Sequence, residues 1–245
     1  MKTWTVSLEF NVMSIKGDDK QSIEQLIQKL HPQGKLIPKW VKQGSHAYRV
    51  QGIRHKKAEN YRCPKWPEEL GRYNDPQEEI GIWYGAQNPC AALAETFGRL
   101  RPRASKGAGI FINVTDLGSR TMCVVEMDRD LKLLDLKLCL SKLARTIDEV
   151  SGADYTLTQE IVRVVSRLPG NPFDGIAYES RHHPDGSSCY ALWTKPGEAT
   201  TVRTVEVTKL SDFEYQGAFP EGFGDDSLDT EEIMTEILGY KVLGF

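Results

Sequence analysis

The chain has 245 residues, of which 40% are hydrophobic and 27% charged, with a formal net charge of −3 and a pI of about 6.0. This length supports one large domain with a substantial core. The slightly acidic balance argues against nucleic acid or an anionic membrane as the main partner.

Cysteine and histidine spacing predicts no metal site. The five cysteines include no Cys-x-x-Cys pair, which also favours a reducing compartment, and the five histidines show no metal-binding pattern. No stretch has the pattern of a secretion signal or the length of a membrane-spanning apolar run. We therefore expect a cytoplasmic protein without a metal.

The first 45 residues are expected to form a strand and a helix. Residues 3–12 alternate between apolar and polar side chains, which predicts a half-buried strand. Residues 21–30 place apolar side chains at helical spacing, and residues 31–46, with two prolines, are interpreted as a connection. We assign residues 1–45 to an extension packed on the main domain.

A strand beginning at His46 leads into a long basic segment. Residues 54–69 are irregular and rich in lysine and arginine, which is typical either of a solvated loop or of a lid or wall over an anionic ligand. The segment ends at Gly71-Arg72-Tyr73-Asn74, a turn that can present a guanidinium group to phosphate oxygens.

Residues 81–97 combine a short buried strand with a helix. The strand is expected to end at Tyr84, while Asn88 is a helix N-cap followed by Pro89 at the first helical position. Glu95 is the only acidic residue of this alanine-rich helix. Composition leaves two interpretations open, in which Glu95 either faces solvent or points into a cleft for a chemical reason.

Two groups of titratable side chains are interpreted as surface features. The basic residues between Arg99 and Lys106 lack interleaved aromatics and are assigned to a solvated helix end and loop. The adjacent His182 and His183 are assigned to an exposed loop, because no nucleophile lies near them in the sequence.

The remaining pattern predicts a mixture of strands and helices. Strands are expected at 109–114, 121–127, 131–136, 176–180, 188–193 and 201–207, and helices at 137–147 and at 157–168, the latter begun by a capping box from Thr156 to Gln159. An acidic tail over 211–245 contains a short helix. We therefore expect a single α+β domain with twisted mixed or antiparallel sheets and flanking helices.

The sequence lacks the common cofactor and nucleophile motifs. It contains no Gly-x-Gly-x-x-Gly, no phosphate-binding loop ending in Gly-Lys-Ser/Thr and no Gly-x-Ser-x-Gly elbow. Arginine, tyrosine, glutamate and serine residues instead stand near the ends of predicted elements. Such a set suits the cleavage of a nucleotide–sugar bond, and the alternative is that these are unrelated scaffold residues.

Four blocks in order resemble the signature of the RES domain family, named for its Arg, Glu and Ser. They are Tyr48-Arg49, Gly71-Arg72-Tyr73-Asn74, Tyr84 preceding Ala91 to Glu95, and Asp174 to Arg181. The resemblance spans residues 46–210. RES proteins are toxins paired with an Xre-like antitoxin, and their fold resembles that of ADP-ribosyltransferase toxins. Characterised members consume NAD⁺ by hydrolysis or phosphorolysis, or transfer ADP-ribose to a protein.

The resemblance implies a role for individual residues. Arg49 and Arg72 would contact the phosphates and ribose of NAD⁺, and Tyr84 would stack near the nicotinamide. Glu95 would hydrogen-bond the nicotinamide ribose and stabilise positive charge on its anomeric carbon, while Ser180 would fix the substrate near the same ribose. The implied NAD⁺-binding set is Arg49, Arg72, Asn74, Tyr84 and Ser180, and the implied catalytic set is Glu95, Arg49 and Ser180.

The expected function is therefore that of a toxin that cleaves the nicotinamide–ribose bond and depletes NAD⁺. One alternative is a mono-ADP-ribosyltransferase that modifies a host protein, and another is a non-catalytic binding module on the same fold. Residues 46–210 would form the catalytic domain. The expected partners are NAD⁺ and a cognate Xre-like antitoxin or immunity protein, with no membrane or direct nucleic-acid contact, and a homodimer is a further assembly that the resemblance allows.

Overall fold

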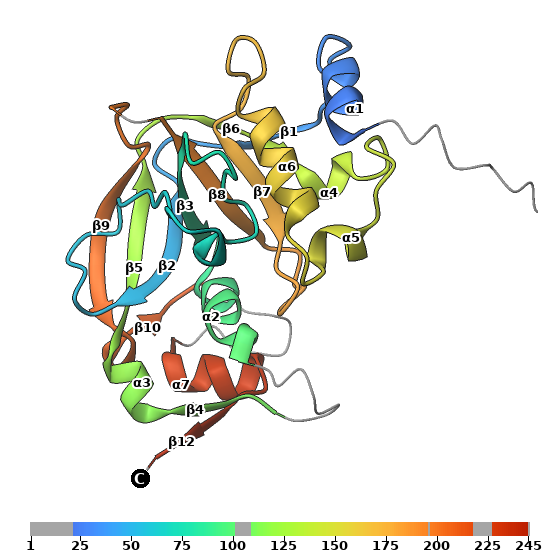
Figure 1. Ribbon diagram of the computed structural model, residues 1–245. Helices are drawn as coiled ribbons and strands as arrows, with labels where there is room; N and C mark the ends of the chain where they lie inside the picture. The colour runs from blue at the N-terminus through green and yellow to red at the C-terminus, as the bar shows by residue number, and fades with distance from the viewer. Residues whose placement is uncertain (1–21, 101–108, 196, 218–226, 245) are drawn as a thin grey trace, which may run out of the picture.

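The computed structural model describes residues 22–100, 109–195, 197–217 and 227–244. The predicted strand at 3–12 lies outside these residues. The main feature is an eight-stranded sheet in the order β1-β6-β7-β8-β3-β2-β5-β9 (Figure 1). Its strands are β1 (Pro38–Val41), β2 (His46–Gly52), β3 (Gly81–Ala86), β5 (Arg120–Met127), β6 (Leu131–Asp135), β7 (Gly175–Glu179), β8 (Ser188–Thr194) and β9 (Val202–Lys209).

The sheet is mixed and curls around one of its faces. β6 and β7 are parallel, and the other neighbouring pairs are antiparallel. All eight strands contribute to one buried cluster, from Val41 in β1 to Val202 in β9. The two edge strands can share a cluster only if the sheet bends toward itself. The expected single α+β domain with flanking helices is therefore confirmed.

The outer face of the sheet carries two helical layers. α1 (Ile23–Leu30) and α6 (Thr156–Val165) bury their apolar sides in a cluster with β6 and β7. α2 (Pro89–Phe97) and α3 (Val114–Gly118) belong to a second cluster. The short helices α4 (Leu136–Cys139) and α5 (Ile147–Ser151) join β6 to α6.

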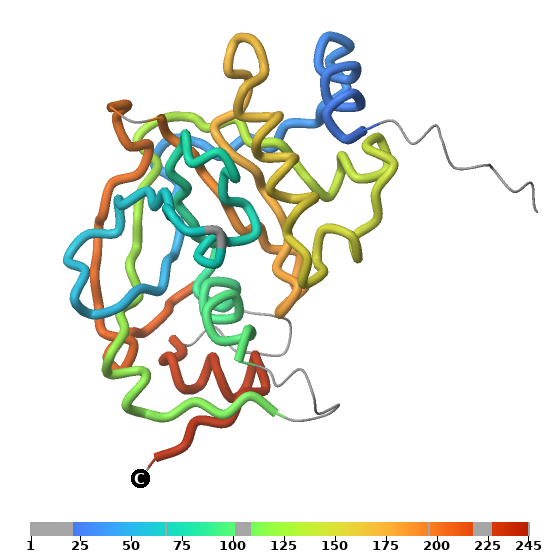
Figure 2. Tube along the Cα trace, in the orientation of Figure 1, coloured from blue at the N-terminus to red at the C-terminus, as the bar shows by residue number. Residues whose placement is uncertain are grey.

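The C-terminal segment packs beside α2, as the Cα trace in Figure 2 shows. α7 (Thr230–Glu232) continues into a π-helical turn (Ile233–Ile237) that buries Ile233 and Met234. β12 (Lys241–Leu243) pairs in parallel with β4 (Phe111–Asn113), and β10 (Glu214–Tyr215) pairs with β11 (Leu228–Asp229). A short helix is thus present in the acidic tail, and residues 218–226 lie outside the described residues.

The boundaries of several predicted elements were wrong. Residues 31–46 contain β1, and the strand expected at 109–114 ends where Asn113 caps α3. The helix expected at 137–147 is divided, because Ala144 has a φ of 52° and a capping box between Thr146 and Glu149 starts α5.

The start of α6 also differs from the prediction. No capping box joins Thr156 and Gln159, since Asp154 accepts hydrogen bonds from both the N–H and the hydroxyl of Thr156. Thr158 and Gln159 instead donate to the carbonyls of Arg72 and Gly71, at 2.6 and 3.1 Å. These bonds attach the 71–74 turn to α6.

None of the helices in the described ranges is both long and apolar enough to cross a bilayer.

Candidate active site

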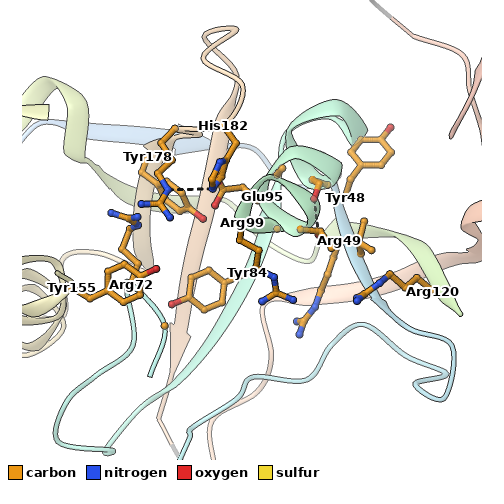
Figure 3. A pocket seen from close by; sticks show the side chains of 17 residues that line it. Tyr48, Arg49, Arg72, Tyr84, Glu95, Arg99, Arg120, Tyr155, Tyr178 and His182 are labelled. Atoms are coloured by element: carbon orange, nitrogen blue, oxygen red, sulfur yellow. Dashed lines mark hydrogen bonds between the residues drawn. The ribbon is translucent and has the colours of Figure 1, made fainter. Parts of the chain in front are cut away.

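A cavity of about 350 Å³ lies where β2 and β3 meet. These strands pair through a single position, Tyr48 with Ala86. Beyond that pair the strands share no ladder, so their side chains and the end of α2 surround an open space. Figure 3 shows the labelled side chains around it.

The cavity is strongly basic. Its described lining includes one carboxylate, from Glu95, and five arginines: Arg49, Arg72, Arg99, Arg120 and Arg181. Within the described ranges none of the five forms an ion pair, whereas six arginines elsewhere do, namely Arg62, Arg129, Arg145, Arg163, Arg167 and Arg203. This excess of positive charge suits an anionic ligand.

α2 places Glu95 on the cavity wall. The helix starts as the sequence predicts, with Asn88 Oδ1 accepting from Ala91 N at 2.8 Å and Pro89 at the first position. Asn88 Nδ2 also donates to Ser187 Oγ at 2.7 Å, which ties the helix to the loop between β7 and β8. Of the two interpretations for Glu95, the structure supports the cleft.

The buried hydroxyl of Ser180 orients the Glu95 carboxylate. This hydroxyl donates to Glu95 Oε1 at 2.7 Å and accepts from the backbone N–H of His182 at 3.2 Å. Ser180 is 1% exposed and is not among the residues that line the cavity. It is therefore placed to orient the carboxylate rather than to face the open space.

Arg72 and Arg181 are held by the end of α5. Arg72 donates from Nη1 to Val150 O and from Nη2 to Ser151 O at 3.2 Å. Arg181 Nη1 donates to the same Ser151 oxygen at 2.7 Å. The guanidinium of Arg72 also lies over the Tyr155 ring, with its Cζ 4.8 Å from the centroid. Backbone carbonyls at a helix C-terminus thus orient two cavity arginines.

Tyr84 and Asn74 are joined beside the 71–74 turn. Tyr84 lines the cavity, and its hydroxyl donates to Asn74 Oδ1 at 3.1 Å while accepting from Tyr73 N at 3.0 Å. Burial raises the pKa of the Tyr84 phenol above its usual range, so the hydroxyl stays protonated. Asn74 is 4% exposed and also accepts from Gly71 N, so it supports the turn and does not line the cavity.

Arg49 is fixed by the basic segment that follows β2. Its Nη1 donates to Asn60 O at 3.1 Å, and its Cζ lies 5.8 Å from the centroid of the Trp83 ring. Burial lowers the pKa of the guanidinium, although arginine remains charged.

The same basic segment combines a solvated part with an anchored part. The lysines and arginines of 54–57 are exposed, whereas Ala58 is buried and bonds to β9 and β3 through Thr204 and the Trp83 indole. Tyr61 bonds to Thr201 at 2.7 Å. The anchored part forms a fixed support for Arg49.

Two interpretations of surface residues need correction. His182 is half-buried and lines the cavity, and a Cβ added at Gly98 would lie 2.4 Å from its Cγ. His183 is also half-buried, 3.5 Å from Asp185. Arg99 is exposed in the 3-10 turn Gly98–Leu100 after α2, as expected for a solvated helix end, and it also lines the cavity. The rest of that predicted basic patch, over 101–106, lies outside the described residues. The glycine that admits His182 was a signal the sequence reasoning did not use.

Arg120 and Tyr155 were not identified as site residues from the sequence. Arg120 begins β5 and reaches the cavity because β5 pairs with β2, with Gly52 opposite Arg120. Tyr155 precedes α6, and its ring supports Arg72. Among the described residues no cluster of three or more His, Cys, Asp or Glu side chains could hold a metal ion.

Comparison with known proteins gives one family. A search of curated proteins found no match. A family model for the RES domain matches residues 46–215, more than half of the chain, and this span includes Glu95, Ser180 and the five cavity arginines. The chain therefore belongs to the RES domain family, which is known from toxin–antitoxin systems and supports a toxin-like role.

Proposed function

We propose that this protein is a toxin that consumes NAD⁺ by cleaving the bond between nicotinamide and ribose. The observation that carries the proposal is the Glu95 carboxylate, which Ser180 holds at 2.7 Å on the wall of an arginine-lined cavity. Oriented negative charge beside a cationic pocket matches a substrate that carries a diphosphate and develops positive charge at one carbon.

Cleavage of this bond requires the protein mainly to bind the substrate and to stabilise the charge that develops in the transition state. When the glycosidic bond breaks, its electron pair neutralises the pyridinium nitrogen and nicotinamide leaves as a neutral molecule. Positive charge then develops on the ribosyl anomeric carbon, where a carboxylate such as Glu95 lowers the transition-state energy. An oxygen of water or phosphate forms the new bond to that carbon and releases a proton.

The remaining side chains would hold the two ends of the substrate. Guanidinium groups suit the diphosphate, because each can donate two parallel hydrogen bonds. Tyr84 offers an aromatic face to the nicotinamide ring. A fixed Glu95 between these groups would act on the ribose.

A direct assay tests the proposal. Purified protein is incubated with NAD⁺ with and without phosphate, and nicotinamide release is measured. Glu95→Gln is expected to reduce the rate by at least about 100-fold, the scale of losing one oriented electrostatic contact. Glu69→Gln, which removes an exposed carboxylate paired with Arg62, is the matched control and should retain the rate.

The products identify the acceptor. Hydrolysis yields ADP-ribose, phosphorolysis yields its 1-phosphate, and transfer leaves labelled ADP-ribose on a protein. Absence of nicotinamide release both with and without phosphate, or full activity of Glu95→Gln, would overturn the proposed reaction.

Expression in cells tests the biological role. Growth inhibition should require Glu95, coincide with a fall in cellular NAD⁺ and be relieved by a cognate Xre-like antitoxin. A binding module would remain inhibitory after Glu95→Gln, because its surface would be unchanged.

A further inference from the structure

Three cavity arginines come from separate elements and gather at one end. Arg49 lies in β2, Arg99 follows α2, and Arg120 begins β5. In Figure 3 their guanidinium groups lie toward the same side of the cavity, whereas Arg72 and Tyr155 lie toward the other side, with Tyr84 between.

The two ends differ in how their arginines are satisfied. Arg72 and Arg181 donate to the carbonyls that end α5. Arg120 stacks over the Phe97 ring, with its Cζ 5.4 Å from the centroid, and its buried Nε has no hydrogen-bond partner among the described residues. The exposed side chain of Arg99 has no hydrogen bond or ion pair to another residue in the described ranges.

A buried guanidinium N–H without an acceptor is unfavourable, and a group of arginines without a carboxylate adds mutual repulsion. At this end Arg49 donates to Asn60 O at 3.1 Å, but no described residue accepts from the buried Nε of Arg120. Glu95, the only acid in the described lining, is itself bonded to Ser180. The acceptor for Arg120 is therefore expected from a ligand.

The number and type of donors identify the class of ligand. One carboxylate can satisfy the paired donors of one guanidinium, whereas a phosphate or diphosphate group offers several charged oxygens in different directions. Three guanidinium groups from three elements, all on one side of the cavity, match the latter.

We propose that Arg49, Arg99 and Arg120 form a subsite for a phosphate group, with Arg120 as a ligand-binding residue that sequence reasoning did not identify. That this phosphate belongs to the diphosphate of NAD⁺ rests on the proposed function. The second source is free phosphate, which would enter as the acceptor of the ribosyl group.

Binding of inorganic diphosphate tests the subsite independently of catalysis. Calorimetric titration of the whole chain should show binding, and Arg120→Gln should weaken it about 10- to 100-fold, as expected for lost hydrogen bonds between charged groups. Arg99→Gln is a second variant at an exposed position and should also weaken binding. The matched control is Arg54→Gln, which removes the same charge from an exposed loop outside the cavity.

Kinetics then distinguish the two sources. If the subsite holds the diphosphate of NAD⁺, Arg120→Gln raises KM for NAD⁺ but leaves turnover of nicotinamide riboside, which lacks phosphate, within about twofold of wild type. If the subsite holds the acceptor, KM for phosphate rises and KM for NAD⁺ does not. Both results support the phosphate subsite.

The outcomes that contradict the subsite are separate from those that contradict the proposed reaction. No binding of diphosphate to the wild-type chain, or equal binding by wild type, Arg120→Gln and Arg99→Gln, would overturn the subsite even if NAD⁺ is cleaved. Diphosphate binding that depends on Arg120, in a chain that releases no nicotinamide, would uphold the subsite and reject the reaction.

Discussion

At the scale of single residues, the pair of Glu95 and Ser180 defines the candidate site. Both residues belong to the family signature, and the structure shows that their side chains contact each other. Ser180 contacts the carboxylate through a 2.7 Å hydrogen bond while remaining outside the lining of the cavity. Its expected role is to fix Glu95, so its removal should affect the chemical step more than substrate binding.

Ser180→Ala tests this positioning role. We expect kcat for NAD⁺ cleavage to fall about 10- to 100-fold with little change in KM, because the loss of one hydrogen bond to a charged group frees the carboxylate to rotate. Steady-state nicotinamide release gives both constants. Ser166→Ala, which removes another buried hydroxyl outside the lining of the cavity, is the control. A rise in KM at constant kcat would instead place Ser180 against the substrate.

At the scale of elements, α6 and the 71–79 segment support the basic wall. Asp75 has a fully buried side chain and accepts from Arg167 Nη2 at 2.9 Å, just beyond the end of α6. It also accepts from the backbone N–H groups of Gln77 and Glu79. Burial raises the pKa of the Asp75 carboxyl, but the hydrogen bonds from Arg167 and the backbone outweigh it and lower the pKa overall.

Asp75→Asn should therefore destabilise the protein in a pH-dependent way. A lowered folded-state pKa stabilises the fold above the unfolded value of about 3.9, and this contribution is lost as pH falls through the folded pKa. At pH 7 we expect the variant to lose about 1–3 kcal/mol of unfolding free energy in urea titrations. The difference from wild type should shrink below about pH 4. A constant difference across that range would show that Asp75 acts through packing instead of charge.

At the scale of the whole molecule, residues before the family match belong to the core. Ile27 of α1 is 0% exposed and shares a cluster with Ile161 and Val165 of α6. Glu24 pairs with Arg163 at 2.5 Å, and β1 adds an edge strand to β6. The sheet and α6 therefore depend on chain that precedes residue 46.

Ile27→Ala measures that dependence. Truncating this buried side chain should lower the free energy of unfolding by about 2–5 kcal/mol, because it removes apolar contact and leaves a cavity. Lys29→Ala, at an exposed position of the same helix, should change stability by less than about 0.5 kcal/mol. Equal urea midpoints for the two variants would mean that α1 contributes little to the core.

The sequence by itself determined the local elements and the order of the key residues. Asn88 and Pro89 set the start of α2, because capping depends on neighbours a few residues apart. Alternating and helical patterns located most strands and α6, for the same local reason. The order of Arg49, Glu95 and Ser180 indicated the family, which fixed the class of protein before any geometry was known.

Only the tertiary structure decided which side chains meet. Pairing of β5 with β2 brings Arg120 to the cavity, and the approach of a loop to Gly98 brings His182 there, although neither residue has a local motif. The backbone carbonyls at the end of α5 accept hydrogen bonds from Arg72. The sequence had indicated that this guanidinium group binds phosphate. Short-range sequence patterns carry no information on such contacts. The hydrogen-bond donors and acceptors lie on segments that are distant in the sequence and come together only when the sheet curls.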